Sequence, residues 1–306
     1  MSPVIQAFAS SRNEPSNWRP TYGQLLTSYD TEYRVLTYSM NPAPRPSFTP
    51  SLLRDLDRFQ QDVRERLSGD VFEGHEPSVR YLVHASTVPG VFNLGGDLEF
   101  FLRTIRARDR QTLTEYAHLS IRVLYANLVN LSLPITTIAL LEGTTLGAGF
   151  EAALSSDVII AERSVQIGFP EVVFNMFPGM GAYSFLARRI SPAMVEQMIT
   201  SGKLYTAEEL HRIGVIDILA EDGAGRRQLQ DFLRKDERSR VTRTALLRMR
   251  ERVHPITLEE LMDISDLWVE SAMNLPEKDL RMMERLVKAQ DRRMSPSPEA
   301  ARQRSG

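Results

Sequence analysis

Apolar residues along this chain follow two patterns, short continuous runs and longer stripes that recur every three or four positions. The clearest stripe predicts an amphipathic helix and consists of Leu52, Leu53, Leu56, Phe59, Val63 and Leu67. Short runs rich in β-branched and aromatic residues predict strands at residues 33–40, 79–85, 135–141, 157–161, 165–167 and 215–219. Helices are predicted between them at residues 113–131, 179–189, 192–200 and 207–213. Strands that alternate with helices predict an α/β fold.

Four segments of the chain differ in composition and periodicity. Residues 1–30 contain Pro3, Pro15 and Pro20 and show little periodicity, so we predict an N-terminal extension. Residues 31–222 carry the alternating strands and helices of the predicted core, and residues 223–293 are helical in pattern throughout. Residues 294–306 read MSPSPEAARQRSG, which predicts a disordered tail.

The composition is that of an ordinary globular chain, with 42% apolar residues, 25% charged residues and a formal net charge of −2. A charge this close to neutral gives no reason to expect nucleic acid or an anionic membrane as a partner. The absence of cysteine excludes disulfides, thiolate metal ligands and cysteine nucleophiles. No apolar run is long enough to span a bilayer, and the polar start is unlike a signal peptide. We therefore expect a cytoplasmic enzyme or binding protein.

Two carboxylates stand in unusual surroundings. Glu151 follows a glycine turn and precedes the apolar run Ala152-Ala153-Leu154, and Glu171 directly follows Pro170 in GFPE. An ionised side chain among apolar residues is costly to bury unless it is paired or used. The spacing therefore predicts a pair of acids that converge on one substrate.

Two glycine turns, Gly95-Gly96 and Gly147-Ala148-Gly149, stand where a predicted strand gives way to a helix. The first N–H groups of a helix have no partner within it, and two of them aimed at one point form an oxyanion hole. Ser155-Ser156 lacks the GxSxG frame of a nucleophilic serine. No His, Asp or Glu grouping has the spacing of metal ligands, so we expect no metal.

Three segments carry a family resemblance. FNLGGDL, EGTTLGAGFEAALSSDVIIA and QIGFPEVVFNMFPGMGAYSFL resemble, in order and spacing, the motifs of the crotonase (enoyl-CoA hydratase) superfamily. The resemblance implies a ββα spiral core, a C-terminal helical region and a homotrimer or a hexamer. It also implies that the backbone N–H groups of Gly96 and Ala148 form the oxyanion hole. Glu151 and Glu171 would be the catalytic acid and base, with the assignment between them open.

Within the superfamily, FNLGGDLEFF and the proline-rich start are most similar to the diffusible signal factor synthases. That resemblance implies dehydration of a 3-hydroxyacyl group on acyl carrier protein, followed by hydrolysis of the thioester. The product would be a cis-2-unsaturated fatty acid used as a quorum-sensing signal. No cofactor is implied beyond the phosphopantetheine or CoA that carries the acyl group. Glu99 stands where many CoA-dependent hydratases carry a lysine, which disfavours CoA.

Two other functions stay open. The chain is also similar to conventional enoyl-CoA hydratases or isomerases of fatty-acid oxidation. A regulator that binds a signalling sensor protein, with catalysis secondary, is the second alternative.

Several residues have both a functional and a structural interpretation. The candidate substrate-binding residues are Gly95, Leu146, Gly147, Met176, Met180 and Trp268. Methionine adapts to flexible ligands, but both methionines and the tryptophan also suit plain core packing. Asp97 is predicted to cap the helix that follows the first glycine turn. Arg103, Arg106, Arg108 and Arg110 would suit a carrier-protein dock or a solvated helix face.

Overall fold

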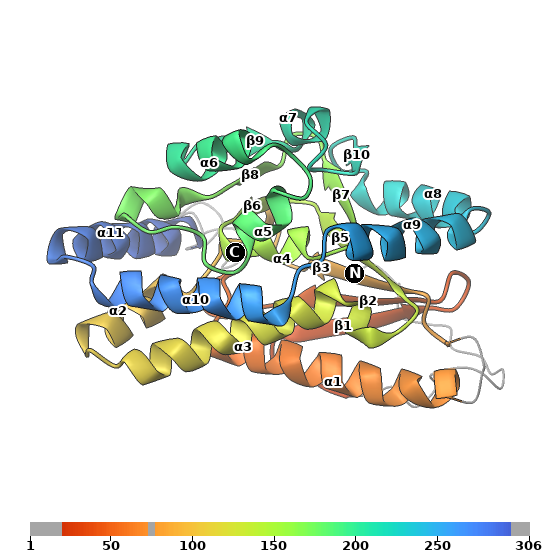
Figure 1. Cartoon of the computed structure of the whole chain (residues 1–306), viewed down its shortest axis with the longest axis horizontal. Helices are drawn as coiled ribbons and strands as arrows, with labels where there is room; N and C mark the ends of the chain where they lie inside the picture. Colours follow the sequence, from red (N-terminus) through yellow and green to blue (C-terminus); the bar gives the residue numbers. More distant parts are fainter. Residues whose placement is uncertain (1–19, 73–76, 295–306) are drawn as a thin grey trace, which may run out of the picture.

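Two β-sheets form the centre of the protein in the computed structural model, which describes residues 20–72 and 77–294 (Figure 1). The larger sheet has the order β1 (Leu25–Asp30), β2 (Val35–Met40), β3 (Tyr81–Ser86), β5 (Thr136–Leu141), β7 (Val158–Glu162) and β10 (Ile218–Ala220). The smaller sheet has the order β4 (Val91–Asn93), β6 (Thr144–Leu146), β8 (Gln166–Gly168) and β9 (Leu204–Thr206). Strands pair in parallel except for β1 with β2 and β8 with β9.

The chain visits the two sheets in turn. Strands β3, β5 and β7 lie in the larger sheet, and each is followed by a short strand of the smaller sheet, β4, β6 or β8. A helical segment then returns the chain to the larger sheet, which gives a repeated ββα unit. The repeat confirms the predicted α/β core. Because β4 and β6 are parallel neighbours, the turns that follow them lie side by side.

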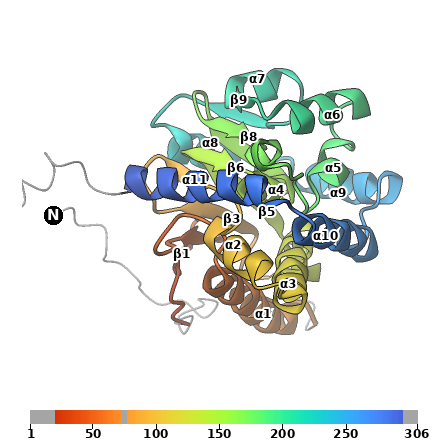
Figure 2. The same ribbon diagram turned by 90° about the vertical axis from the view of Figure 1, so that its left-hand side faces the viewer.

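Helices enclose the sheets. They are α1 (Pro50–Phe72), α2 (Leu98–Arg106), α3 (Arg110–Leu128), α4 (Ala148–Leu154), α5 (Ala182–Leu186), α6 (Pro192–Ser201), α7 (Ala207–Arg212), α8 (Gly225–Asp236), α9 (Arg240–Val253), α10 (Leu258–Met273) and α11 (Glu277–Met294). Two 3-10 helices, η1 (Asn130–Ser132) and η2 (Pro170–Phe174), complete the chain. All six residues of the predicted apolar stripe of α1 are buried. In the C-terminal helical region, α10 lies along α3 and α11 lies against α2 (Figures 1 and 2).

Some predicted boundaries are wrong. Strand β1 falls within residues 1–30, which the pattern assigned to an extension. Two neighbouring leucines lie on opposite faces of this strand, with Leu25 buried and Leu26 56% exposed. The sequence of the strand therefore lacks a clear alternation of apolar and polar residues. The helix predicted at 179–189 shortens to α5, because Gly181 at φ 108° forms a turn before it. The last strand begins at Ile218, after a loop in which Val215 and Ile216 are buried.

Other predictions fall partly outside the described residues. Residues 1–19 of the predicted extension and 295–306 of the predicted tail are in this group. Across residues 20–72 and 77–294, no helix combines the length and apolar character that crossing a membrane requires.

Candidate active site

The two glycine turns meet at the edge of the smaller sheet. Gly95 at φ 97° follows β4, and Gly147 at φ 51° follows β6, and glycine adopts such angles without strain. A Cβ on Gly95 would lie 3.1 Å from Leu146 O and 3.4 Å from Ala148 N, so the turns are in contact. The buried Asn93 side chain accepts a hydrogen bond of 2.8 Å from Gly95 N and fixes the first turn.

The backbone N–H groups of Gly96 and Ala148 lie beside one cavity, since both residues line it. Ala148 is the first residue of α4, where the helix supplies no acceptor for its N–H. Within the described part of the chain, neither N–H donates to a protein acceptor. Two free donors beside one cavity can hold a negatively charged oxygen.

Glu151 projects from α4, one helical turn after Ala148. It is 1% exposed, and its Oε1 accepts hydrogen bonds from Met180 N at 2.7 Å and Ala182 N at 3.0 Å. Burial raises the pKa of Glu151 to about 7, and the two N–H donors oppose that rise by stabilising the carboxylate. Met180, just before α5, and Ala182, its first residue, therefore orient the Glu151 side chain.

Glu171 reaches the same cavity from η2. Strand β8 pairs with β6 through Leu146 and Gly168, which brings Glu171 beside the second glycine turn. Burial, reinforced by the negative charge of Glu151, raises the pKa of Glu171 to about 8. Its Oε2 is buried without a hydrogen-bond partner. Both carboxyls are therefore easier to protonate than a free glutamate, and Glu171 more so than Glu151, because Glu151 has the two N–H donors.

The cavity that contains both carboxyl groups has a volume of about 350 Å³, within the range of about 300–1,000 Å³ typical of small-molecule sites. Of the predicted substrate-binding residues, Leu146, Met180 and Trp268 line it. Gly95 and Gly147 are not among the lining residues, and they form the turns behind the lining. Met176 is not among the lining residues and packs in the hydrophobic core, so its part in substrate binding stays a prediction.

An aromatic wall that the motifs did not predict stands beside the first glycine turn. The Phe101 ring lies on Gly96, where an added Cβ would be 2.5 Å from Cζ. Its centroid is 5.2 Å from that of Tyr116 and 5.0 Å from that of Trp268, both in edge-on contact. The Trp268 ring in turn lies directly against Gly179. Asp97 caps α2 as predicted, by accepting from Phe100 N.

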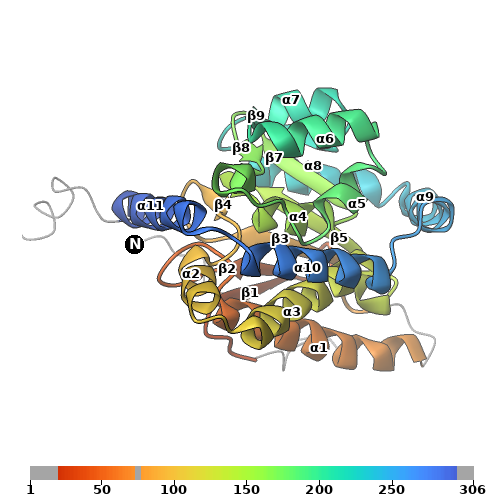
Figure 3. The ribbon, with the colours of Figure 1, turned by 60° about the vertical axis from the view of Figure 1, so that its left-hand side comes forward.

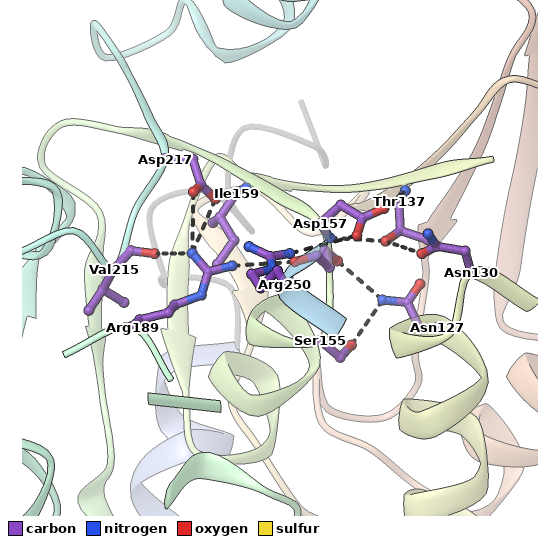
Figure 4. Close-up of polar contacts among 11 residues, drawn as sticks. Asn127, Asn130, Thr137, Ser155, Asp157, Ile159, Arg189, Val215, Asp217 and Arg250 are labelled. Atoms are coloured by element: carbon purple, nitrogen blue, oxygen red, sulfur yellow. Dashed lines mark hydrogen bonds and ion pairs between the residues drawn. The ribbon is translucent and has the colours of Figure 1, made fainter. Parts of the chain in front are cut away.

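A polar network holds the far end of α4 (Figure 4). Asn127 on α3 donates to the hydroxyls of Ser155 and Ser156 at 2.9 and 3.2 Å. Asp157 accepts from Thr137 N on β5 at 3.1 Å. The short helix that carries Glu151 is thus fixed at both ends, which limits the freedom of that carboxyl. The described residues contain no group of three His, Cys, Asp or Glu side chains suited to a metal ion.

Comparison with known proteins gives a consistent result. Residues 63–236 match the family model described as enoyl-CoA hydratase/isomerase. The chain is 30% identical over 173 residues to the mitochondrial methylglutaconyl-CoA hydratase of Homo sapiens, covering 56% of this chain and 47% of that one. It is 32% identical over 182 residues to the probable enoyl-CoA hydratase 2 of Arabidopsis thaliana, covering 60% and 55%. The match thus spans about half the length of these curated relatives.

Solved structures share the fold over most of the chain. The enoyl-CoA hydratase of Bacillus halodurans superposes with a TM-score of 0.70 at 20% identity, covering 86% of this chain and 99% of that one. Pseudomonas aeruginosa DspI gives 0.57 at 21% identity, covering 90% and 91%. These likenesses confirm the crotonase-type spiral with C-terminal helices. Since the family model also matches more than half of the sequence, this chain belongs to the enoyl-CoA hydratase/isomerase family.

Proposed function

We propose that this protein adds or removes water across the C2–C3 bond of an acyl thioester. The observation that carries the proposal is the shared cavity, which is lined by the carboxyls of Glu151 and Glu171 and by Gly96 and Ala148, whose N–H groups have no acceptor among the described residues. The thioester oxygen accepts from Gly96 N and Ala148 N, which stabilise the enolate formed when the C2 proton leaves. One glutamate exchanges that proton, and the other serves the oxygen at C3.

The geometry favours one assignment of the two glutamates. Glu171 lies against Gly147, next to the donor Ala148 N and hence near the thioester carbon and C2. Glu151 lies one helical turn further along α4, nearer to C3. In hydration Glu151 takes a proton from water and Glu171 delivers its proton to C2. Dehydration runs the same path backward, so Glu171 takes the C2 proton and Glu151 protonates the departing hydroxyl.

The lining favours an uncharged acyl group. Among the described residues that line the cavity, none is Lys, Arg or His. A methylglutaconyl group, named for the human relative, carries a second carboxylate that would have no cation to pair with here. We therefore propose an apolar acyl chain as the substrate class.

The finer proposal is a diffusible signal factor synthase, which dehydrates a 3-hydroxyacyl carrier protein and then hydrolyses the thioester. In the second step a glutamate activates water and the same two N–H groups hold the tetrahedral oxyanion. The motif resemblance supports this proposal. Glu99 also supports it. This position carries a carboxylate, which pairs with Arg45 at 2.6 Å, and therefore provides no cation for a CoA phosphate.

The arginines of α2 give the carrier proposal limited support. Arg106 pairs with Glu277 and Glu284 of α11 at 3.0 and 3.2 Å, and so braces α2 against that helix. Arg108 donates to the carbonyl of Met273 at 2.8 Å. A carrier dock on this face would therefore rest on Arg103 and Arg110. The trimer or hexamer, the sensor-protein partner and the cytoplasmic location likewise stay proposals from the resemblance.

A conventional enoyl-CoA hydratase is the second candidate, which the names of the relatives favour. Mass spectrometry separates the two after incubation with 3-hydroxydodecanoyl carrier protein and, separately, with its CoA thioester. Free cis-2-enoic acid from the carrier-bound substrate supports the synthase. Reversible hydration of the trans-2-enoyl-CoA without free acid supports the conventional hydratase. No turnover of either substrate contradicts the proposed function and favours the binding protein.

A further inference from the structure

The cavity has an open end and a closed end. At the open end its lining includes the exposed residues Pro89, before β4, and Ala289 on α11. At the closed end it includes Ala117 and Ser120 of α3 and Ser265 of α10, all buried. A thioester bound to a large carrier must leave its carrier in solvent. In this orientation the carrier stays outside the cavity at the Pro89 end, and the acyl tail extends toward the closed end.

The closed end lies where α3 and α10 run side by side (Figures 1 and 3). A hydrogen bond of 2.7 Å between His118 and Asp266 joins the two helices on their outer side. On the inner side, the small residues Ala117, Ser120 and Ser265 line the cavity beside two larger ones, Tyr116 of α3 and Trp268 of α10. The two helices are thus held together outside while leaving room inside.

The serine hydroxyl groups at this end donate to the backbone of their own helices and not to a ligand. Ser120 Oγ donates to Tyr116 O, and Ser265 Oγ donates to Met262 O, each at 2.9 Å within its own helix. Both hydroxyl protons are therefore used by the backbone, and these serines act on a ligand chiefly through their small size. Such an end suits the methyl terminus of an aliphatic chain.

We propose that the acyl tail inserts between α3 and α10, and that Ala117, Ser120 and Ser265 set the longest chain that the enzyme accepts. The proposal rests on the proposed function and extends it by naming the residues that select the substrate. A larger side chain at these positions occupies the volume of the terminal methylenes. Each methylene left without a site lowers kcat/KM by about fourfold, from the transfer free energy of one buried CH₂ group.

The test compares Ser265→Leu and Ser120→Leu with wild type over saturated-tail substrates of increasing length. Both variants should lose at least about tenfold in kcat/KM on the longest substrate that wild type accepts, and should stay within about twofold on the shortest. Ser271→Leu, an exposed serine on the same helix α10, is the matched control and should follow wild type at every length. An unchanged chain-length profile in both buried-serine variants overturns the proposal.

A second variant and a binding assay cover the cases in which activity cannot decide. If either leucine variant unfolds at assay temperature, Ala117→Val takes its place, because valine adds less volume. This variant should lower the longest accepted chain length by a smaller step. An unchanged limit in Ala117→Val also overturns the proposal. If wild type turns over no thioester, the proposed function fails, and calorimetric binding of saturated fatty acids then tests the pocket alone. A length limit that shortens in the variants supports the proposal, and a limit that does not move contradicts it.

Discussion

Gly147 and Glu171 are in such close contact that a Cβ on Gly147 would overlap the Oε1 atom of Glu171. Gly147 therefore has two independent requirements for glycine. Its backbone at φ 51° and ψ −125° is strained for any other residue, and the Glu171 carboxyl occupies the space that a side chain on Gly147 would need. The turn that presents Ala148 N thus also sets the position of one member of the glutamate pair.

Gly147→Ala should lower kcat at least about a hundredfold, because it displaces Glu171 and distorts the oxyanion turn together. Gly69→Ala is the control, since Gly69 is an exposed helical glycine with nothing within 4 Å of the added methyl. Steady-state kinetics of the two variants on one substrate makes the comparison. Near-normal kcat in Gly147→Ala would show that the contact has no role in positioning.

The pH profile should reflect a pair that works with one proton. Glu151 with a pKa of about 7 and Glu171 with a pKa of about 8 predict a narrow bell-shaped dependence of kcat/KM, with its maximum between these values. Activity falls at lower pH because both carboxyls are protonated, and at higher pH because both are ionised. A profile flat from about pH 6 to about pH 9 would exclude this pair as the titrating groups.

Glu171→Gln should stabilise the fold increasingly as pH rises. The pKa of Glu171 is raised from 4.5 to about 8 on folding, so between these values the folded state binds more protons than the unfolded chain. The contribution of Glu171 to stability therefore decreases as pH rises through this window. Removing the charge should raise the Tm more at about pH 9 than at about pH 5. Glu259→Gln on the exposed face of α10 should show no such trend, and equal shifts at both pH values for Glu171→Gln would refute the assigned burial cost.

Gly179→Ala should weaken substrate binding through Trp268. The added methyl would overlap the Trp268 ring, which lines the cavity and packs against Phe101. The displaced ring would narrow the cavity, so KM should rise severalfold while kcat changes less. Tryptophan fluorescence reports whether the ring has moved. A moved ring with unchanged KM would place Trp268 outside the substrate path.

Local sequence explains much of this site. The glycine turns stand out because each follows a predicted strand, and both glutamates because their neighbours are apolar. The structure brings Gly96, Ala148 and both glutamates to one cavity. Strand β1 escaped prediction because its stability comes from pairing with β2 rather than from its own pattern.

The far wall of the cavity depends on contacts between distant segments. Ser120 and Ser265 are separated in sequence by most of the core and meet only because α10 lies along α3. Nothing within either helix distinguishes them from other buried serines. Met176 is close to Glu171 in sequence, yet it packs in the hydrophobic core and is not among the residues that line the cavity.

The most direct test of the glutamate mechanism is hydration of a 2-enoyl thioester in water labelled with heavy oxygen, followed by mass spectrometry. The account predicts one labelled oxygen at C3 with wild type. It also predicts a loss of at least about a thousandfold in the labelling rate with Glu151→Gln and with Glu171→Gln, while both variants keep the wild-type fold. Labelling at the wild-type rate in either variant, or none with wild type, would contradict water chemistry by this pair.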